Sequence, residues 1–170
     1  MIDKIDLENN LNRVHEWIRA ADQKVSIFLA FQGVVITFLF PKLLSWSPRS
    51  LGSISWASIL ALLAGLIFLL YGLIKSVCAL IPRLKKKTKG ESFIYFGDIA
   101  EMNFGYFKKG LAKLDGKDYE NELIKQIYIS AKIAKTKHQQ FGDSIISFLL
   151  GLAILGFVFI SLTTTRWYGN

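Results

Sequence analysis

The sequence predicts an all-α membrane protein, in which three long helices span the membrane and extend into a small cytoplasmic helical bundle with a short cap. The chain of 170 residues is 52% hydrophobic and has a mean hydropathy of +0.35, which is too apolar for an ordinary soluble domain of this length. Its apolar residues gather in three segments without charge. No proline separates the first of these segments from the charged sequence before it.

The uncharged segments determine the number of spans. Residues 54–74 and 144–165 hold 21 and 22 uncharged residues, and a helix needs about 20 to cross the hydrocarbon layer. The segment 25–41 is shorter, but Lys42 can extend its ammonium group outward so that the helix continues to residue 44. Charge-free runs of this length disfavour a soluble core of three buried helices. The charged 24-residue lead disfavours a signal peptide.

The basic residues predict the orientation. With a cytoplasmic N-terminus, 18 of the 21 lysines and arginines lie on the inner side, as the positive-inside rule requires. The net charge of +8 is therefore a topology signal, and nucleic-acid binding is the weaker interpretation. The predicted organisation is 1–24 cytoplasmic amphipathic helix, 25–44 first span, 45–53 outer loop, 54–80 second span, 81–142 cytoplasmic cap and helix, 143–165 third span and 166–170 outer tail.

The first helix carries a heptad seam, whose apolar residues alternate in spacing by four and three, and such a seam packs against other long helices. The seam is Leu7, Leu11, Val14, Ile18, Ala21 and Val25. Pro41 and the Ser-rich stretch after it predict the outer turn. In the second span, small residues suit close contact between helices in lipid. They are Ala61, Ala64, Gly65 and Gly72.

The last helix is expected to begin near Asp118 and to carry one stripe at helical spacing. The stripe is Tyr119, Leu123, Ile127, Ala131, Ala134, His138 and Phe141. It would face the seam of the first helix if the two helices pack antiparallel. The aromatic segment 93–99 predicts a short strand, or a loop followed by a helix that starts at Asp98.

Catalytic signatures are absent, since the sequence has no phosphate-binding Gly-rich loop, no zinc-protease motif and no nucleophile elbow. Cys78 is the single cysteine, and the cytoplasmic carboxylates other than Asp98 are interpreted as solvated charge. We therefore expect no catalysis, no metal site and no cofactor. Few polar residues lie within the spans, which argues against a channel that is open at rest. They are Gln32, Thr37, Ser55, Ser58, Ser147 and Ser161.

Two blocks of sequence carry a family pattern. The first, Asn-x-x-Arg-x-x-x-Trp-Ile-x-x-Ala-Asp-x-Lys, runs from Asn10 through Arg13, Trp17, Ile18, Ala21 and Asp22 to Lys24. The second is Tyr95-Phe96-Gly97-Asp98-Ile99, followed by Tyr119, Gln126, Ile127 and Lys135. Together with the order of the spans, these blocks resemble the Pycsar transmembrane effectors, which are small bacterial membrane proteins paired with pyrimidine nucleotide cyclases in antiphage defence. The resemblance covers nearly the whole chain.

The resemblance implies a function. A cyclase produces cyclic UMP or cyclic CMP on phage infection, and the effector senses it, assembles as a homo-oligomer and impairs the bacterial inner membrane, so that infection is abortive. Arg13 or Arg19 could bind the phosphate, and an aromatic side chain of Trp17, Tyr95 or Phe96 could stack on the base. Asp98 could accept from a ribose hydroxyl.

Structural roles remain open for the same residues. Trp17 is equally suited to packing at the membrane interface or to a cation–π pair with Arg13. Structural or gating roles are predicted for Asp22, Lys24 and Lys135. Residues 96–100 also resemble the phosphate-binding turn of cyclic-nucleotide-binding domains, but that domain needs more chain than this cytoplasmic region offers. The alternative function is a non-enzymatic membrane scaffold that packs with a partner protein through the seam.

Overall fold

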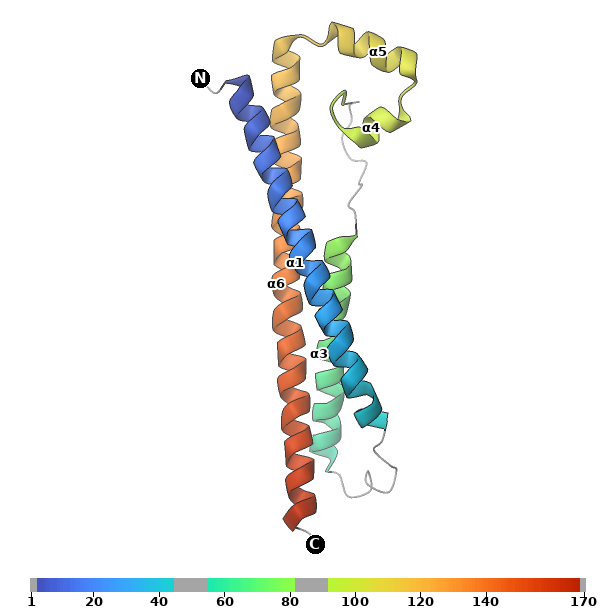
Figure 1. Cartoon of the computed structure of the whole chain (residues 1–170), viewed down its shortest axis with the longest axis vertical. Coiled ribbons are helices and arrows are strands. Elements are labelled where there is room, and N and C mark those ends of the chain that lie inside the picture. The colour runs from blue at the N-terminus through green and yellow to red at the C-terminus, as the bar shows by residue number, and fades with distance from the viewer. Residues whose placement is uncertain (1–2, 45–54, 82–91, 169–170) are drawn as a thin grey trace. The chain divides into compact units, whose positions relative to one another are not determined.

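The computed structural model describes residues 3–44, 55–81 and 92–168, and its regular elements within these ranges are all α-helices. The predicted all-α class is thus confirmed. The expected outer loop at 45–53 and the basic run at 83–89 lie outside the described residues. The helices, shown in Figure 1, are α1 (Lys4–Leu44), α3 (Trp56–Leu80), α4 (Phe96–Glu101), α5 (Phe104–Lys113) and α6 (Gly116–Tyr168).

Three of these helices, α1, α3 and α6, are long and apolar enough to cross a membrane. Pro41 lies inside α1, which continues to Leu44. The turn predicted at this proline is therefore wrong, whereas the extension of the helix to residue 44 is confirmed. A proline in a helix removes one backbone hydrogen bond, and the last turn of α1 tolerates that loss.

The chain divides into two compact units. The first consists of the residues up to Ala21 together with Ile81–Lys137, and the second of Asp22–Leu80 together with the residues from His138 onward. The helices α1 and α6 contribute residues to both units, whereas α4 and α5 belong to the first and α3 to the second.

In the first unit, the seam predicted on α1 is confirmed. Leu7, Val14 and Ala21 are buried, and the two seam residues between them are half-buried. Contacts to α6 join Glu8 with Tyr119 and His15 with Ser130. Because both residue numbers rise together, α1 and α6 run parallel in this unit, and the antiparallel packing considered from the sequence is wrong. This orientation follows from the order of the helices, because α3 lies between α1 and α6 in the chain and runs in the opposite direction to α6.

The α6 stripe is only partly as predicted. Leu123 and Ala134 are buried, but Ala131 and His138 are exposed. Their places are taken by polar side chains, which follow a three- and four-residue spacing from Leu123. These buried polar residues are Gln126, Ser130 and Lys137. The buried stripe of α6 therefore has a heptad period. A search for apolar residues alone does not reveal this period, because three of the five buried residues are polar.

The cap of the first unit consists of α4 and α5. The segment before α4 is a loop, and α4 begins at Phe96, two residues earlier than the alternative with a helix from Asp98. Phe93 joins the loop before α4 to α5, because its ring packs against Gly110 and its centroid lies 6.1 Å from that of Tyr106. A side chain at position 110 would collide with this ring, so the glycine makes the contact possible.

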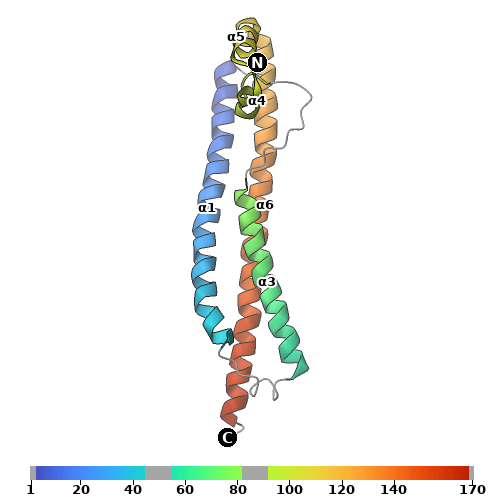
Figure 2. The same ribbon diagram turned by 90° about the vertical axis from the view of Figure 1, so that its right-hand side faces the viewer.

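In the second unit, α3 packs closely against α6, as Figures 1 and 2 both show. A Cβ atom on Gly151 would lie 2.8 Å from the carbonyl oxygen of Gly65 and from the backbone nitrogen of Leu69. One on Gly72 would lie 3.0 Å from the carbonyl oxygen of Ser144 and from the backbone nitrogen of Phe148. The predicted use of Gly65 and Gly72 for close helix contact is therefore confirmed, and Gly151 is the partner of Gly65 on α6.

Helix α1 completes the second unit through aromatic packing. The ring of Phe28 makes edge-to-face contacts with Phe148 at 5.8 Å and with Phe141 at 5.9 Å between ring centroids. Phe148 is fully buried and forms the core with Leu69 and Leu155. Side chains on the opposite surfaces of the helices are largely exposed and apolar, as expected for surfaces that face lipid.

Candidate functional site

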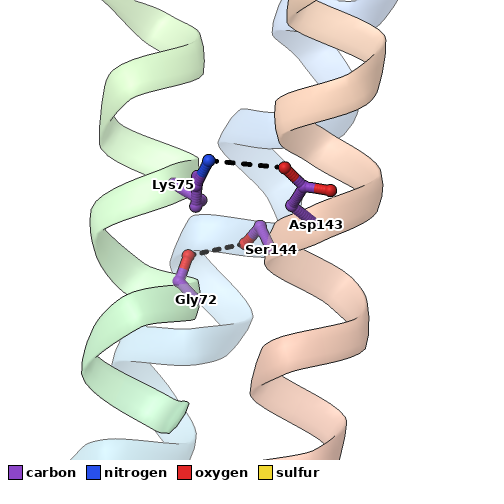
Figure 3. A network of polar contacts seen from close by, with 4 residues as sticks. All are labelled: Gly72, Lys75, Asp143 and Ser144. Carbon is purple, nitrogen blue, oxygen red and sulfur yellow. Dashed lines mark hydrogen bonds and ion pairs between the residues drawn. The ribbon is translucent and has the colours of Figure 1, made fainter. Parts of the chain in front are cut away.

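A buried polar network lies at the centre of the second unit, where all three helices meet. The hydroxyl of Ser144 on α6 donates to the carbonyl oxygen of Gly72 at 2.7 Å, as Figure 3 shows. It accepts from Ser76 of α3 at 2.6 Å and from the Nε2 amide of Gln32 of α1 at 3.3 Å. A hydroxyl has one proton to donate and two lone pairs, so the hydrogen-bonding capacity of Ser144 is filled.

Gln32 is the incompletely satisfied member of this network. Its side chain is 0% exposed, yet its Oε1 atom has no hydrogen-bond partner among the residues that the structure describes. Because Ser144 already donates its only proton to Gly72, it can only accept from Gln32, and this fixes the orientation of the amide. A buried carbonyl oxygen without a partner costs about 1–3 kcal/mol of stability, so Gln32 destabilises the packed unit at this position.

An ion pair lies beside the network. The Nζ atom of Lys75 is 3.4 Å from Oδ2 of Asp143, and these residues precede Ser76 and Ser144 in the sequence. The ammonium group of Lys75 also lies 5.2 Å from the ring centroid of Tyr71. The pair joins α3 to α6 with opposite charges at the end of the apolar stretch of each helix, where an uncompensated charge would be costly in lipid.

The first unit contains a second polar network, which attaches the cap to α6. The carboxylate of Glu122 accepts from the hydroxyl of Ser92 at 3.0 Å and from the backbone N–H of Phe93 at 3.1 Å. Ser92 in turn accepts from Gln126 at 3.4 Å and is 4% exposed. The prediction that Glu122 is merely solvated charge is therefore wrong.

Asp98 belongs to the same network. Its Oδ2 atom accepts from the backbone N–H of Ser92 at 3.0 Å. The carboxylate of this candidate ligand-binding residue thus closes the turn before α4. The adjacent rings of Tyr95 and Phe96 lie 4.9 Å apart between centroids, and Phe96 is 65% exposed.

The candidate residues on α1 form a separate surface in the first unit. Arg13 and Trp17 lie one helical turn apart and are both exposed, Trp17 by 53%. Among the described residues, Arg13 makes no hydrogen bond, ion pair or cation–π contact. The cation–π pair with Trp17 considered from the sequence is therefore not formed, and the guanidinium group is available to an anion.

The residues expected to have structural or gating roles lie on α1 and α6. Asp22 is half-buried, and its backbone carbonyl accepts from the hydroxyl of Ser26 at 2.9 Å. Lys24 and Lys135 are exposed. Across the described ranges, no hydrogen bond, ion pair or ring contact joins Arg13 or Trp17 to the Tyr95–Asp98 segment.

A shallow depression in the first unit has a volume of about 320 Å³, and Phe93, Asn121, Glu122 and Lys125 are among its lining residues. It offers an aromatic ring, an amide and an ammonium group, but also the carboxylates of Asp118 and Glu122, which disfavour an anionic ligand. The described residues hold no cluster of three or more His, Cys, Asp or Glu side chains that could bind a metal ion.

Comparison with known proteins agrees with the sequence pattern. A family profile described as the Pycsar effector protein domain, PycTM, matches residues 6–164. The Pycsar effector protein GmPycTM of Gulbenkiania mobilis is 24% identical over 164 residues, which cover 84% of each chain. No solved structure matches this chain.

Proposed function

This chain belongs to the family of Pycsar effector proteins, membrane effectors of antiviral defence, and we propose that a cyclic pyrimidine mononucleotide, cyclic UMP or cyclic CMP, activates it to impair the bacterial inner membrane. The signal would come from a pyrimidine nucleotide cyclase, and the active form would be a homo-oligomer. The N-terminus, the cap and the aqueous part of α6 would lie in the cytoplasm, where the nucleotide is made. Loss of membrane integrity would then end the infection before phage mature.

The observation that carries this proposal is the inward orientation of the polar side chains in the second unit. Gln32, Ser76 and Ser144 are each 0% exposed, whereas apolar residues such as Ile27 and Phe157 are 72% and 73% exposed. An arrangement of this kind is compatible with an intact bilayer. It favours a protein that leaves the membrane sealed until a signal rearranges its helices.

The nucleotide would be bound by groups that are exposed on α1. The guanidinium group of Arg13, which has no partner among the described residues, is suited to the cyclic phosphate through charge-assisted hydrogen bonds. Trp17 exposes an indole face beside it for the pyrimidine. Tyr95, Phe96 and Asp98 would contribute by closing on the nucleotide or by receiving it from a second copy, and Asp22, Lys24 and Lys135 by transmitting the change.

The experiment that tests this function is dye leakage from liposomes that contain the purified protein. We expect leakage on addition of cyclic UMP or cyclic CMP, and none with cyclic AMP or with linear UMP, which differ in the base or in the ring phosphate. Absence of both binding and leakage with either pyrimidine nucleotide would reject the proposal. A stable complex with a partner protein and no response to nucleotide would favour the scaffold alternative.

Removal of the charge at position 13 is expected to weaken nucleotide binding. The Arg13→Gln variant should raise the Kd by about 10- to 100-fold, since a hydrogen bond to a charged group contributes about 1.5–3 kcal/mol. Arg19→Gln is the comparison, because Arg19 is also exposed on α1 and is the alternative phosphate ligand. Calorimetric titration measures both variants, and an affinity of Arg13→Gln equal to that of the parent protein would remove Arg13 from the site.

A further inference from the structure

We propose that the buried network of Gln32, Ser76 and Ser144, extended by Ser147, is the place where water and small ions cross the membrane in the active effector. This inference rests on the proposed function, and it specifies the route. Permeation would follow the interior surface of the three-helix unit, instead of a general disruption of the surrounding lipid.

The composition of the network is the first reason. Each of the three spanning helices contributes to it, α1 with Gln32, α3 with Ser76 and α6 with Ser144. Ser147 lies one turn further along α6 and is 8% exposed. Polar side chains at membrane depth are costly and commonly line the pathways of water and ions. Gln32, Ser76 and Ser144 thus form one polar layer across the three helices, and Ser147 extends this layer by one turn along α6.

The unpaired oxygen of Gln32 is the second reason. Its carbonyl is fully buried and unpartnered, so any opening that admits water supplies the donor it lacks. Lipid chains cannot supply one. The free-energy cost of opening this interface is therefore lower than for an interface whose polar groups are all bonded. Because the new hydrogen bond needs a donor, water is favoured over lipid in the opened gap.

The unequal attachment of the helices indicates which one moves. The helices α3 and α6 meet through backbone contacts at Gly72 and Gly151, too close to admit a Cβ atom without displacement. In contrast, α1 packs against this pair through side chains. They are Gln32 with its 3.3 Å hydrogen bond, the rings of Phe28 and Phe31, and Val35, Ile36 and Leu39. We infer that α1 moves away from a persistent α3–α6 pair, which exposes all the polar members of the network to the same gap.

Cysteine accessibility tests this inference. The single native cysteine is removed by Cys78→Ser, and Ser144→Cys or Ser76→Cys is added to this background. Ile146→Cys is the matched control, because Ile146 lies two residues from Ser144 on α6 and is 61% exposed on the apolar surface. The probe is a quaternary-ammonium methanethiosulfonate, which does not enter lipid and reacts only with thiols that water reaches. The effector is reconstituted in liposomes, with and without cyclic UMP or cyclic CMP.

We expect the nucleotide to raise the labelling rate of Ser144→Cys by about tenfold or more, since the closed unit shields it, and to leave Ile146→Cys unlabelled. Nucleotide-dependent leakage without labelling at 144 or 76 would overturn the inference and leave the proposed function intact. Equal labelling of the control would overturn it too, because it would indicate general disruption. If the nucleotide causes neither leakage nor labelling, both proposals fail.

A second variant keeps the test independent of cysteine chemistry. Gln32→Leu removes the unpaired oxygen and leaves a side chain of similar size, so we expect stable folding, unchanged nucleotide affinity and about tenfold less leakage, if water depends on this amide. Gln23→Leu, at an exposed position of α1, is the control. Full leakage by Gln32→Leu would contradict a route through the network.

Discussion

Replacement of Gly151 by leucine is expected to force α3 away from α6 and to lower the free energy of unfolding by about 3 kcal/mol or more. The reason is that even a Cβ atom at this position would lie 2.8 Å from two backbone atoms of α3. Backbone cannot move aside as a flexible side chain does, so the helices must separate. Unfolding of the purified protein by denaturing detergent, followed by circular dichroism and tryptophan fluorescence, measures the change.

The matched control is Gly156→Leu, which places the same side chain on the same helix. A Cβ atom at Gly156 meets no other atom within 4 Å, and the position is exposed. We expect its free energy of unfolding to stay within about 0.5 kcal/mol of the parent value, as is usual for surface substitutions. Equal losses for the two variants would show that added bulk on α6, and not the contact with α3, is responsible.

Replacement of Glu122 by alanine is expected to detach the cap from α6. It leaves the hydroxyl of Ser92 and the backbone N–H of Phe93 without their acceptor, and each unpaired buried group costs about 1–3 kcal/mol. Amide hydrogen exchange in residues 92–113 should therefore become faster by about 10- to 100-fold, whereas exchange in α3 stays unchanged. Mass spectrometry of proteolytic peptides measures both regions in one experiment.

Two further variants identify the cause. Asn121→Ala changes the exposed neighbour on the same helix and should leave the exchange rates as they are. Glu122→Gln keeps one acceptor oxygen, so we expect an intermediate increase. Unchanged exchange in Glu122→Ala would mean that the aromatic contacts of Phe93 hold the cap without the carboxylate.

The features predicted correctly from the sequence depend on local patterns of apolar residues. Three helices able to span the membrane follow from hydropathy, because lipid leaves the backbone few alternatives to a helix. The α1 seam was predictable because its members are all apolar, and Leu7, Val14 and Ala21 are indeed buried. The glycines at 65 and 72 were predictable from the rule that small residues mark close contacts in lipid.

The features that were missed depend on side chains distant in sequence. Lys137 and Gln126 occupy the α6 seam, although their polarity suggests the solvent side. Glu122 binds a loop 30 residues before it, and no periodicity marks such a contact. In the sequence, Ser144 is only the first residue of an uncharged run, yet it bonds to groups 72 and 112 residues earlier in the chain. The candidate ligand-binding residues stay a prediction.

The hydroxyl groups outside the central network have a consequence for how this protein is made. Ser26, Thr37 and Thr164 each donate to a carbonyl one turn earlier in their own helix, so their protons are not available to a neighbouring helix. Recognition between helices therefore depends on the glycine, serine and glutamine positions already described, together with the Lys75–Asp143 ion pair and the aromatic contacts of Phe28. Insertion depends instead on overall hydropathy. Variants at these positions should be inserted into the membrane as completely as the parent protein. Their helices should then fail to pack together, and the cell should degrade them.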